Sequence, residues 1–182
     1  MVILGIDPGS GVTGYGFVEY VRKTYRFIEC GCIRTDADRP FPQRLERIYD
    51  GLVELIGVRR PDEASIEDVF MNRDVRGALK IGQVRGVAML AVVKSGVPIF
   101  EYSPAEVKRA VVGSGAASKE QVQFMIRHLL KLDELPKPSD AADALAIALC
   151  HAHRVGQPGR TVLPIRRGKT DKVFWEKLAK AQ

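Results

Sequence analysis

The sequence has few cysteines, and their arrangement argues against both a disulfide framework and a zinc site. Cys30, Cys32 and Cys150 are an odd number of thiols, so a disulfide framework is not expected. Cys150 lies beside His151 and close to His153, and these residues could contribute to a zinc site. No C-x-x-C pair supports such a site, and buried reduced thiols with a histidine at a helix end fit the pattern better.

Long apolar segments are absent as well. The longest uninterrupted runs, 87–93 and 144–150, have seven residues each, whereas a membrane span needs about 20. No basic segment precedes the first apolar run, and Asp7 interrupts that run early, so no signal peptide is visible. We therefore expect a cytoplasmic protein with no membrane partner.

The remaining composition is that of an ordinary globular chain with an uneven charge distribution. With 182 residues, 46% of them hydrophobic, one domain with its own core is expected. Residues 154–182 hold eight Lys and Arg against two acids, which is the whole net charge of +6, and residues 1–153 hold twenty of each sign. Such a basic extension favours an anionic partner, nucleic acid first, although a merely solvated tail has the same composition.

The pattern predicts the α/β class. Strands are expected at 2–7, 12–21, 25–35, 63–67 and 97–102, and helices at 42–58, 74–95, 104–112, 118–131 and 139–154. Three consecutive strands followed by α/β units predict a mixed five-stranded sheet, an antiparallel meander plus two parallel strands, with helices on both faces. We expect this domain to span 1–155. The tail, 156–182, is then mobile and binds DNA, or it docks on the domain around Trp175.

Two helices have features of their own. The second half of 74–95 is apolar almost all round, which predicts deep burial. Gly82 and Gly86 leave a smooth strip on it, which fits either tight packing on the sheet or a contact between two subunits. In the last helix, Ser139 or Asp140 is expected to be the N-cap.

A glycine motif at 9–14 spells G-x-G-x-x-G directly after the first strand. The dinucleotide-binding fingerprint requires a helix next, but the following residues are strongly β, and Asp7 would repel a phosphate. The glycines are better explained by a tight hairpin.

Four acids from three distant segments are the stronger signal. Asp7 ends the first strand, Glu67 ends the fourth, and Asp140 and Asp143 share one face of the last helix. Each alone could be a turn, cap or solvated residue. Together they could converge, and converging like charges require compensation. A carboxylate set suits Mg²⁺ or Mn²⁺, and two such ions about 4 Å apart can activate a water and stabilise the leaving oxygen in phosphodiester hydrolysis.

Segments 5–9, 66–72, 78–87 and 140–146, together with their order, resemble RuvC, the family of bacterial Holliday junction resolvases. The resemblance covers nearly all of 1–155. It implies a ribonuclease H-like fold and a homodimer formed through the 74–95 helix. Such a dimer nicks two strands of a four-way DNA junction symmetrically, leaving 5′-phosphate and 3′-hydroxyl ends. The RuvA and RuvB branch-migration proteins are the partners that it implies.

The resemblance also assigns site residues. Asp7, Glu67, Asp140 and Asp143 would be the catalytic, metal-binding tetrad for two Mg²⁺ ions, with Mn²⁺ as a substitute and Asp7 between the ions. Phe70 matches an aromatic side chain that stacks on a base near the junction centre. Lys108 and Lys119 match lysines that face DNA phosphate. Arg73 and Arg76 are added as DNA contacts from their charge and position.

Two other classes of function remain to be distinguished. An actin-like phosphotransferase also begins with an Asp-containing hairpin, but it needs two such lobes, and this chain has one. A junction-binding protein without chemistry is the second alternative. Four acids facing phosphate would weaken a pure binder, which argues against that reading.

Overall fold

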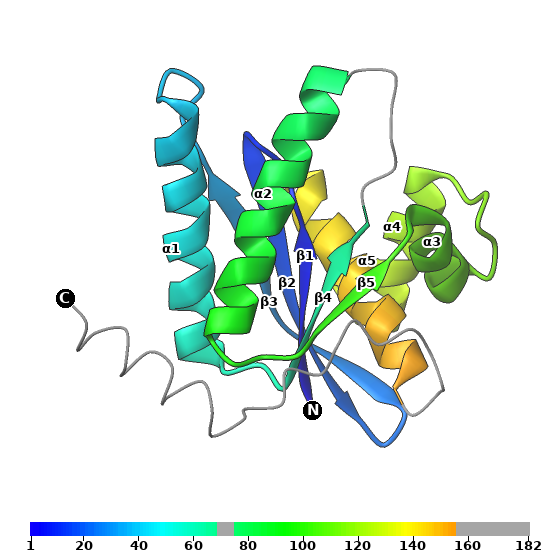
Figure 1. The fold of residues 1–182 in the computed structure, drawn as a ribbon. Helices are drawn as coiled ribbons and strands as arrows, with labels where there is room; N and C mark the ends of the chain where they lie inside the picture. Colours follow the sequence, from blue (N-terminus) through cyan, green and yellow to red (C-terminus); the bar gives the residue numbers. More distant parts are fainter. Residues whose placement is uncertain (69–74, 156–182) are drawn as a thin grey trace.

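The computed structural model describes residues 1–68 and 75–155, so Phe70, Arg73 and the basic tail lie outside the described residues (Figure 1). The strands are β1 (Val2–Asp7), β2 (Val12–Val21), β3 (Thr24–Arg34), β4 (Glu63–Glu67) and β5 (Ile99–Tyr102). The helices are α1 (Phe41–Arg59), α2 (Val75–Lys94), α3 (Pro104–Val112), α4 (Lys119–Leu129) and α5 (Ser139–Arg154). No helix in these ranges is long and apolar enough to cross a membrane.

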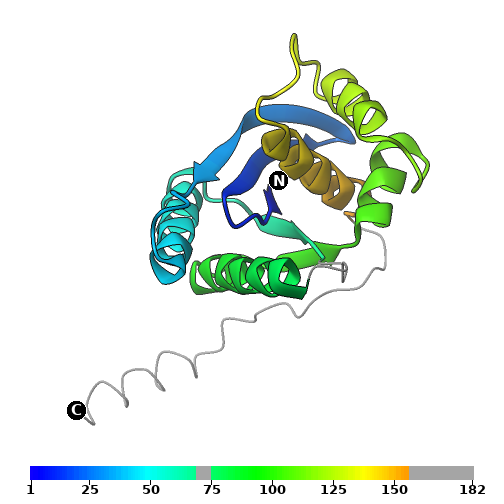
Figure 2. The same cartoon turned by 90° about the horizontal axis from the view of Figure 1, so that it is seen from above.

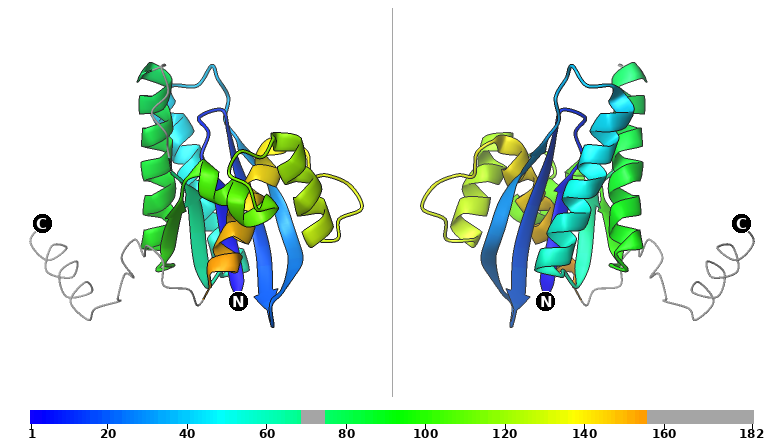
Figure 3. Two further views of the ribbon diagram at one scale, coloured as in Figure 1. Left: turned by 90° about the vertical axis from the view of Figure 1, so that its right-hand side faces the viewer. Right: turned by 90° about the vertical axis from the view of Figure 1, so that its left-hand side faces the viewer.

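The strands form one mixed sheet in the order β3-β2-β1-β4-β5. β1, β2 and β3 pair antiparallel, while β4 lies parallel to both β1 and β5. This confirms the predicted meander with two added parallel strands. Viewed edge-on, the sheet carries α1 and α2 on one face and α3, α4 and α5 on the other (Figure 3). From above, α1 and α2 lie side by side (Figure 2).

The alternation of β1 supplies both hydrophobic cores. Leu4 and Ile6 are fully buried against the side chains of α1 and α2. Ile3 is fully buried in the second core, on the α5 face. Because side chains alternate along a strand, Gly5 and Asp7 face α5 together with Ile3.

Glycines let α5 approach the backbone of the sheet. A β-carbon on Gly5 would lie 2.0 Å from the carbonyl oxygen of Ala144, and one on Gly14 would lie 2.1 Å from that of Asp140. A β-carbon on Gly16 would meet the side chain of Leu145 at 2.8 Å. These contacts leave no room for a side chain, so α5 has a single position across β1 and β2.

The far end of α5 is fixed by a buried polar chain. His151 Nε2 lies 2.6 Å from a carboxylate oxygen of Glu63, and His151 Nδ1 lies 2.6 Å from the hydroxyl of Tyr102. Glu63 and Tyr102 belong to β4 and β5, so both of these strands hold the same helix. His151 is therefore a buried histidine with both ring nitrogens paired, as predicted. Cys30 and Cys32, which were also expected to be buried, are only half-buried.

One prediction about the helices is wrong, and another holds only in part. Neither Ser139 nor Asp140 is the N-cap of α5. The N-cap is Pro138, whose carbonyl accepts from the N–H of Ala141 at 3.1 Å, so Ser139 and Asp140 lie inside the first turn. Within the described residues, no side chain makes a cap hydrogen bond at this end of α5.

The predicted deep burial of the second half of α2 holds for one stripe only. Ala88 and Val92 are fully buried, but Leu90 is 50% exposed. β-carbons on Gly82 and Gly86 would meet nothing within 4 Å. Only one stripe of α2 packs on the sheet and α1. The glycine strip faces away from the sheet, which removes tight sheet packing as its explanation.

Candidate active site

Two strand ends bring the first pair of acids together. β1 and β4 run parallel with Ile6 beside Ile66, so Asp7 and Glu67 follow side by side at the carboxyl edge of the sheet. Both face α5, because Ser65, two residues before Glu67, donates its hydroxyl to the carbonyl of Ile147 at 3.2 Å. The sheet register therefore sets the two carboxylates on the same face.

The first turn of α5 adds the second pair. Gly14 is the β2 partner of Asp7, and the Cα of Gly14 lies against the backbone of Asp140. Asp140 and Asp143 are therefore held beside the end of β1, one turn apart. All four predicted acids meet at this edge of the sheet.

A cavity of about 250 Å³ lies where these elements meet. Its polar lining consists of Asp7, Glu67, Asp143, Lys108 and Lys119. Its apolar wall consists of Pro104, Val107, Val122 and Ala146. Asp140 lies beside the cavity and acts on Asp7 through its charge. The structure thus brings the tetrad and both predicted lysines to one place.

The Lys119 ammonium lies 2.7 Å from a carboxylate oxygen of Asp143, so this acid is already paired in an internal salt bridge. Within the two described ranges, no three Asp, Glu, His or Cys side chains are spaced closely enough to hold an ion together. The carboxylates thus form an open acidic cavity in which one member is paired to lysine.

The electrostatics of the cavity are dominated by burial and repulsion. Burial, followed by the charges of Glu67, Asp143 and Asp140, raises the pKa of Asp7 to about 7, and Lys119 opposes this shift. Burial and Asp143 raise the pKa of Glu67, while Lys108 and Lys119 lower it. The hydrogen bond to Asp143 raises the pKa of Lys119.

The fold therefore holds like charges together against their mutual repulsion. A cation among them would relieve that repulsion. The donors are carboxylate oxygens, which are the ligands that hard divalent ions such as Mg²⁺ and Mn²⁺ prefer. By its chemistry, this set of residues fits the predicted metal.

Sequence reasoning missed two arginines that position this edge. Arg85 of α2 donates to the backbone carbonyl of Glu67 at 3.2 Å and also pairs with the carboxylates of Glu101 and Asp68. It therefore fixes the end of β4 from the opposite face. The only signal in the sequence was the position of Arg85 next to the apolar second half of this helix.

The second arginine is Arg44, near the start of α1. Its guanidinium donates to the carbonyl of Ser10, and its Nε donates to the hydroxyl of Thr35 at 3.2 Å. Ser10 lies in the turn that follows Asp7, so Arg44 fixes that turn.

The remaining predicted DNA contacts are less central. Lys108 is half-buried on α3 and lines the cavity. Arg76 is exposed in the first turn of α2. The first turn of α2 lies at the edge of the sheet where β1 and β4 end (Figure 1). Phe70 and Arg73 lie between Glu67 and α2, outside the described residues.

The mixed sheet, with acids at the carboxyl edge of adjacent strands, places the chain in the ribonuclease H-like class. The family model described as "Crossover junction endodeoxyribonuclease RuvC" matches residues 3–151. The chain belongs to this RuvC family, which confirms the resemblance found in its sequence motifs.

Individual relatives agree over most of their length. RuvC of Pelotomaculum thermopropionicum is 51% identical over 153 residues, covering 84% of this chain and 93% of that protein. The Thermus thermophilus RuvC structure has a TM-score of 0.79 at 38% identity, covering 85% of this chain and 95% of that one. A complex of T. thermophilus RuvC with a Holliday junction substrate gives a TM-score of 0.78 at 35% identity.

Membership of this family makes the chain a nuclease, a hydrolase that depends on a divalent metal. It also removes the actin-like phosphotransferase as an alternative. The acidic cavity is where such a nuclease would place its chemistry, because phosphodiester hydrolysis requires both a positioned water and charge stabilisation at the leaving oxygen.

Proposed function

We propose that this chain resolves four-way DNA junctions during recombination and repair, cutting two opposed strands symmetrically and leaving 5′-phosphate and 3′-hydroxyl ends. One observation carries the proposal: three acids from β1, β4 and α5 meet two lysines at a single cavity, and the charge of a fourth acid beside the cavity acts on Asp7. The T. thermophilus relative described above was solved with a Holliday junction substrate, which supports this choice of DNA.

Asp7, Glu67, Asp140 and Asp143 are the proposed catalytic residues and the ligands that would hold the metal. When bound, two Mg²⁺ ions, or Mn²⁺ in their place, would supply water activation and charge stabilisation at the leaving oxygen. Asp7 is the acid on which the charges of the other three all act, and the family resemblance implies that it would be shared by the two ions. Arg85 and Arg44 keep the elements that carry Glu67 and Asp7 in place.

Lys108 and Lys119 offset the repulsion between the acids and a DNA phosphate. A cavity lined by acids repels a DNA phosphate, and these two ammonium groups lie in the same cavity. We assign both lysines to the phosphate next to the cut bond. Lys119 would move from Asp143 to that phosphate, since an ammonium group can exchange one anion for another at hydrogen-bond distance.

Contacts farther from the cut are assigned from sequence and charge. Phe70 would stack on a base near the junction centre, and Arg73 and Arg76 would contact phosphates. The nuclease domain would span 1–155, and the basic tail, 156–182, would add sequence-independent attraction to DNA. RuvA and RuvB are the expected partners, and the cytoplasm is the expected location.

The proposed dimer forms through the 74–95 helix. The outward stripe of α2 consists of Val75, Leu79, Gly82, Gly86 and Leu90. Such an apolar stripe with no cover within the described chain is typical of an interface. A two-fold axis at this stripe would present two identical cavities to opposed strands.

The test is nicking of a synthetic four-way junction in Mg²⁺, beside linear duplex of the same sequence, with wild type and Asp7→Asn. We expect symmetric nicks on the junction only. Asp7→Asn should retain binding and nick at least about 10³-fold more slowly, a loss of about 4 kcal/mol in transition-state stabilisation. Equal cutting of duplex would remove the junction specificity. Binding without nicking in either Mg²⁺ or Mn²⁺ would leave a junction-binding protein.

A further inference from the structure

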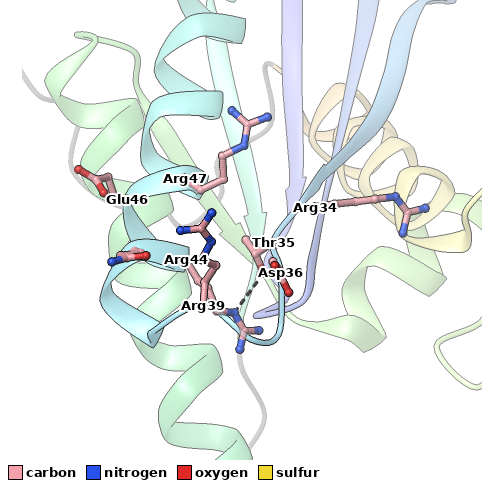
Figure 4. A pocket seen from close by; sticks show the side chains of 8 residues that line it. Arg34, Thr35, Asp36, Arg39, Arg44, Glu46 and Arg47 are labelled. Carbon is pink, nitrogen blue, oxygen red and sulfur yellow. Dashed lines mark hydrogen bonds between the residues drawn. The ribbon is translucent and has the colours of Figure 1, made fainter.

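A second polar hollow lies at the same edge of the sheet, where β3 ends and α1 begins. It has a volume of about 440 Å³. Its lining consists of Arg34, Thr35, Asp36, Arg39, Gln43, Arg44, Glu46 and Arg47 (Figure 4). We call it the arginine hollow. None of its residues belongs to the acidic cavity.

The arginine hollow is positively charged and accessible. Four arginines line it against two acids, Asp36 and Glu46. Arg39 and Arg47 are exposed, and no ion pair within the described residues includes either of them. Guanidinium groups without carboxylate partners, gathered in a concave surface, are suited to phosphate oxygens.

The four arginines do not have the same role. Arg44 is committed to the turn after β1, through its bonds to Ser10 and Thr35. Arg34 extends away from the α1 side of the hollow (Figure 4). Arg39 and Arg47 have no such bonds in the described chain, so their guanidinium groups are available to a ligand.

The turn after Asp7 is hydrogen-bonded to a residue that lines the arginine hollow. The hydroxyl and N–H of Thr35 donate to the carbonyls of Ser10 and Gly11 at 2.8 and 3.0 Å. Ser10 and Gly11 form the turn that directly follows Asp7. An extended ligand with one anionic group at Asp7 would therefore pass over this turn and reach the arginine hollow.

We propose that Arg39 and Arg47 bind backbone phosphates of a junction arm, beyond the phosphate that is cut. This inference rests on the proposed function. A DNA strand carries one phosphate about every 3.4 Å along the helix axis, so it offers further phosphates to a site next to the first. The open, exposed arginine hollow fits such a continuous polyanion better than it fits an enclosed small anion.

The test is equilibrium binding of a synthetic four-way junction over a range of salt concentrations, using the full chain and the double variant Arg39→Gln/Arg47→Gln. Arg44 is left intact because it holds the turn next to Asp7. At about 100 mM salt, binding should weaken at least about 10-fold. The slope of log affinity against log salt should decrease in magnitude by about 2 for each subunit bound, or about 4 for the proposed dimer. Nicking at saturating enzyme should stay within about twofold of wild type, since neither residue reaches the acidic cavity.

The matched control is Arg26→Gln, an arginine near the β2–β3 turn at the opposite edge of the sheet, 80% exposed and paired with Glu19. It should keep the wild-type salt slope. Ethylation interference locates the contact: ethylated phosphates that weaken wild type but not the double variant should lie outside the cut position.

An unchanged slope and affinity in the double variant, with wild type nicking the junction, would overturn the inference. That result would leave the arginine hollow to another partner, such as an acidic protein. Wild type that neither binds nor nicks the junction would overturn the proposed function and this inference together.

Discussion

Two sets of glycines in this molecule have opposite surroundings. Gly5, Gly14 and Gly16 lie in the sheet, where α5 fills the space that their side chains would take. Gly82 and Gly86 lie on α2, where a side chain would meet nothing within 4 Å. The first set brings a helix onto the backbone of the sheet, and the second leaves a helix surface open.

The difference shows that glycine can allow close packing either within one chain or between two subunits. On the α5 face, close contact is completed within the chain and sets the position of Asp140 and Asp143. On the α2 face, the smooth strip is flanked by exposed Leu79 and Leu90, and its partner would be a second subunit. The first set builds the geometry of the acidic cavity, and the second set lies in the proposed dimer interface.

The largest effect should come from Gly5→Ala. Its β-carbon would lie 2.0 Å from the carbonyl oxygen of Ala144 and 2.7 Å from the backbone nitrogen of Ala148, and neither atom can turn aside. We expect a loss of about 3 kcal/mol or more in the free energy of unfolding, measured by denaturant titration.

The control for that variant is Gly86→Ala. It should stabilise the isolated chain by about 0.5–1 kcal/mol, because alanine is the better helix former and the site is open. The same substitution is thus expected to lower the free energy of unfolding at Gly5 and to raise it at Gly86. Equal effects at Gly5 and Gly86 would contradict the close contact of α5.

A smaller effect is expected from Gly86→Arg, read by sedimentation equilibrium. A charged side chain on the outward stripe of α2 should weaken the proposed dimer at least about 30-fold, which is about 2 kcal/mol, while the chain stays folded. Gly57→Arg is the matched control, an exposed helical glycine on α1 with nothing within 4 Å. If both variants remain as dimeric as wild type, the dimer does not use this stripe.

The sequence allowed much of the site to be predicted. Asp7 and Glu67 each end a short apolar strand, and strand ends are local features. Asp140 and Asp143 lie one turn apart in a helical pattern. Parallel strands place their carboxyl ends at one edge, so the meeting of Asp7 and Glu67 followed from the predicted order of elements. The residue pattern left open whether the helical pair joins them, and the family resemblance supplied that part of the prediction.

Other features depend on contacts between distant residues. Lys119 meets Asp143 across 24 positions, and Arg85 reaches Glu67 across 18, and no local pattern encodes either pair. The exposed stripe of α2 was misjudged because an apolar surface suited to another subunit has the same composition as a core. The arginine hollow was missed because its arginines are spread over the end of a strand, a loop and a helix.

The acidic cavity also predicts a pH dependence. The pKa of Asp7 is about 7 in the native chain against an ordinary value of 3.8. Between these values the native state keeps a proton that the unfolded chain has released. Asp7 therefore makes the protein less stable as pH rises from about 4 to 7, and the full destabilisation is present above that range.

The most direct test of the central claim measures unfolding of wild type and Asp7→Asn without DNA, with and without Mg²⁺. The account predicts that without Mg²⁺ at about pH 8 the variant is more stable by about 2 kcal/mol, and that this gap narrows as pH falls toward 5. Mg²⁺ should then stabilise wild type much more than the variant. Equal stabilities at pH 8, with equal responses to Mg²⁺, would contradict a fold that holds these carboxylates together for a cation.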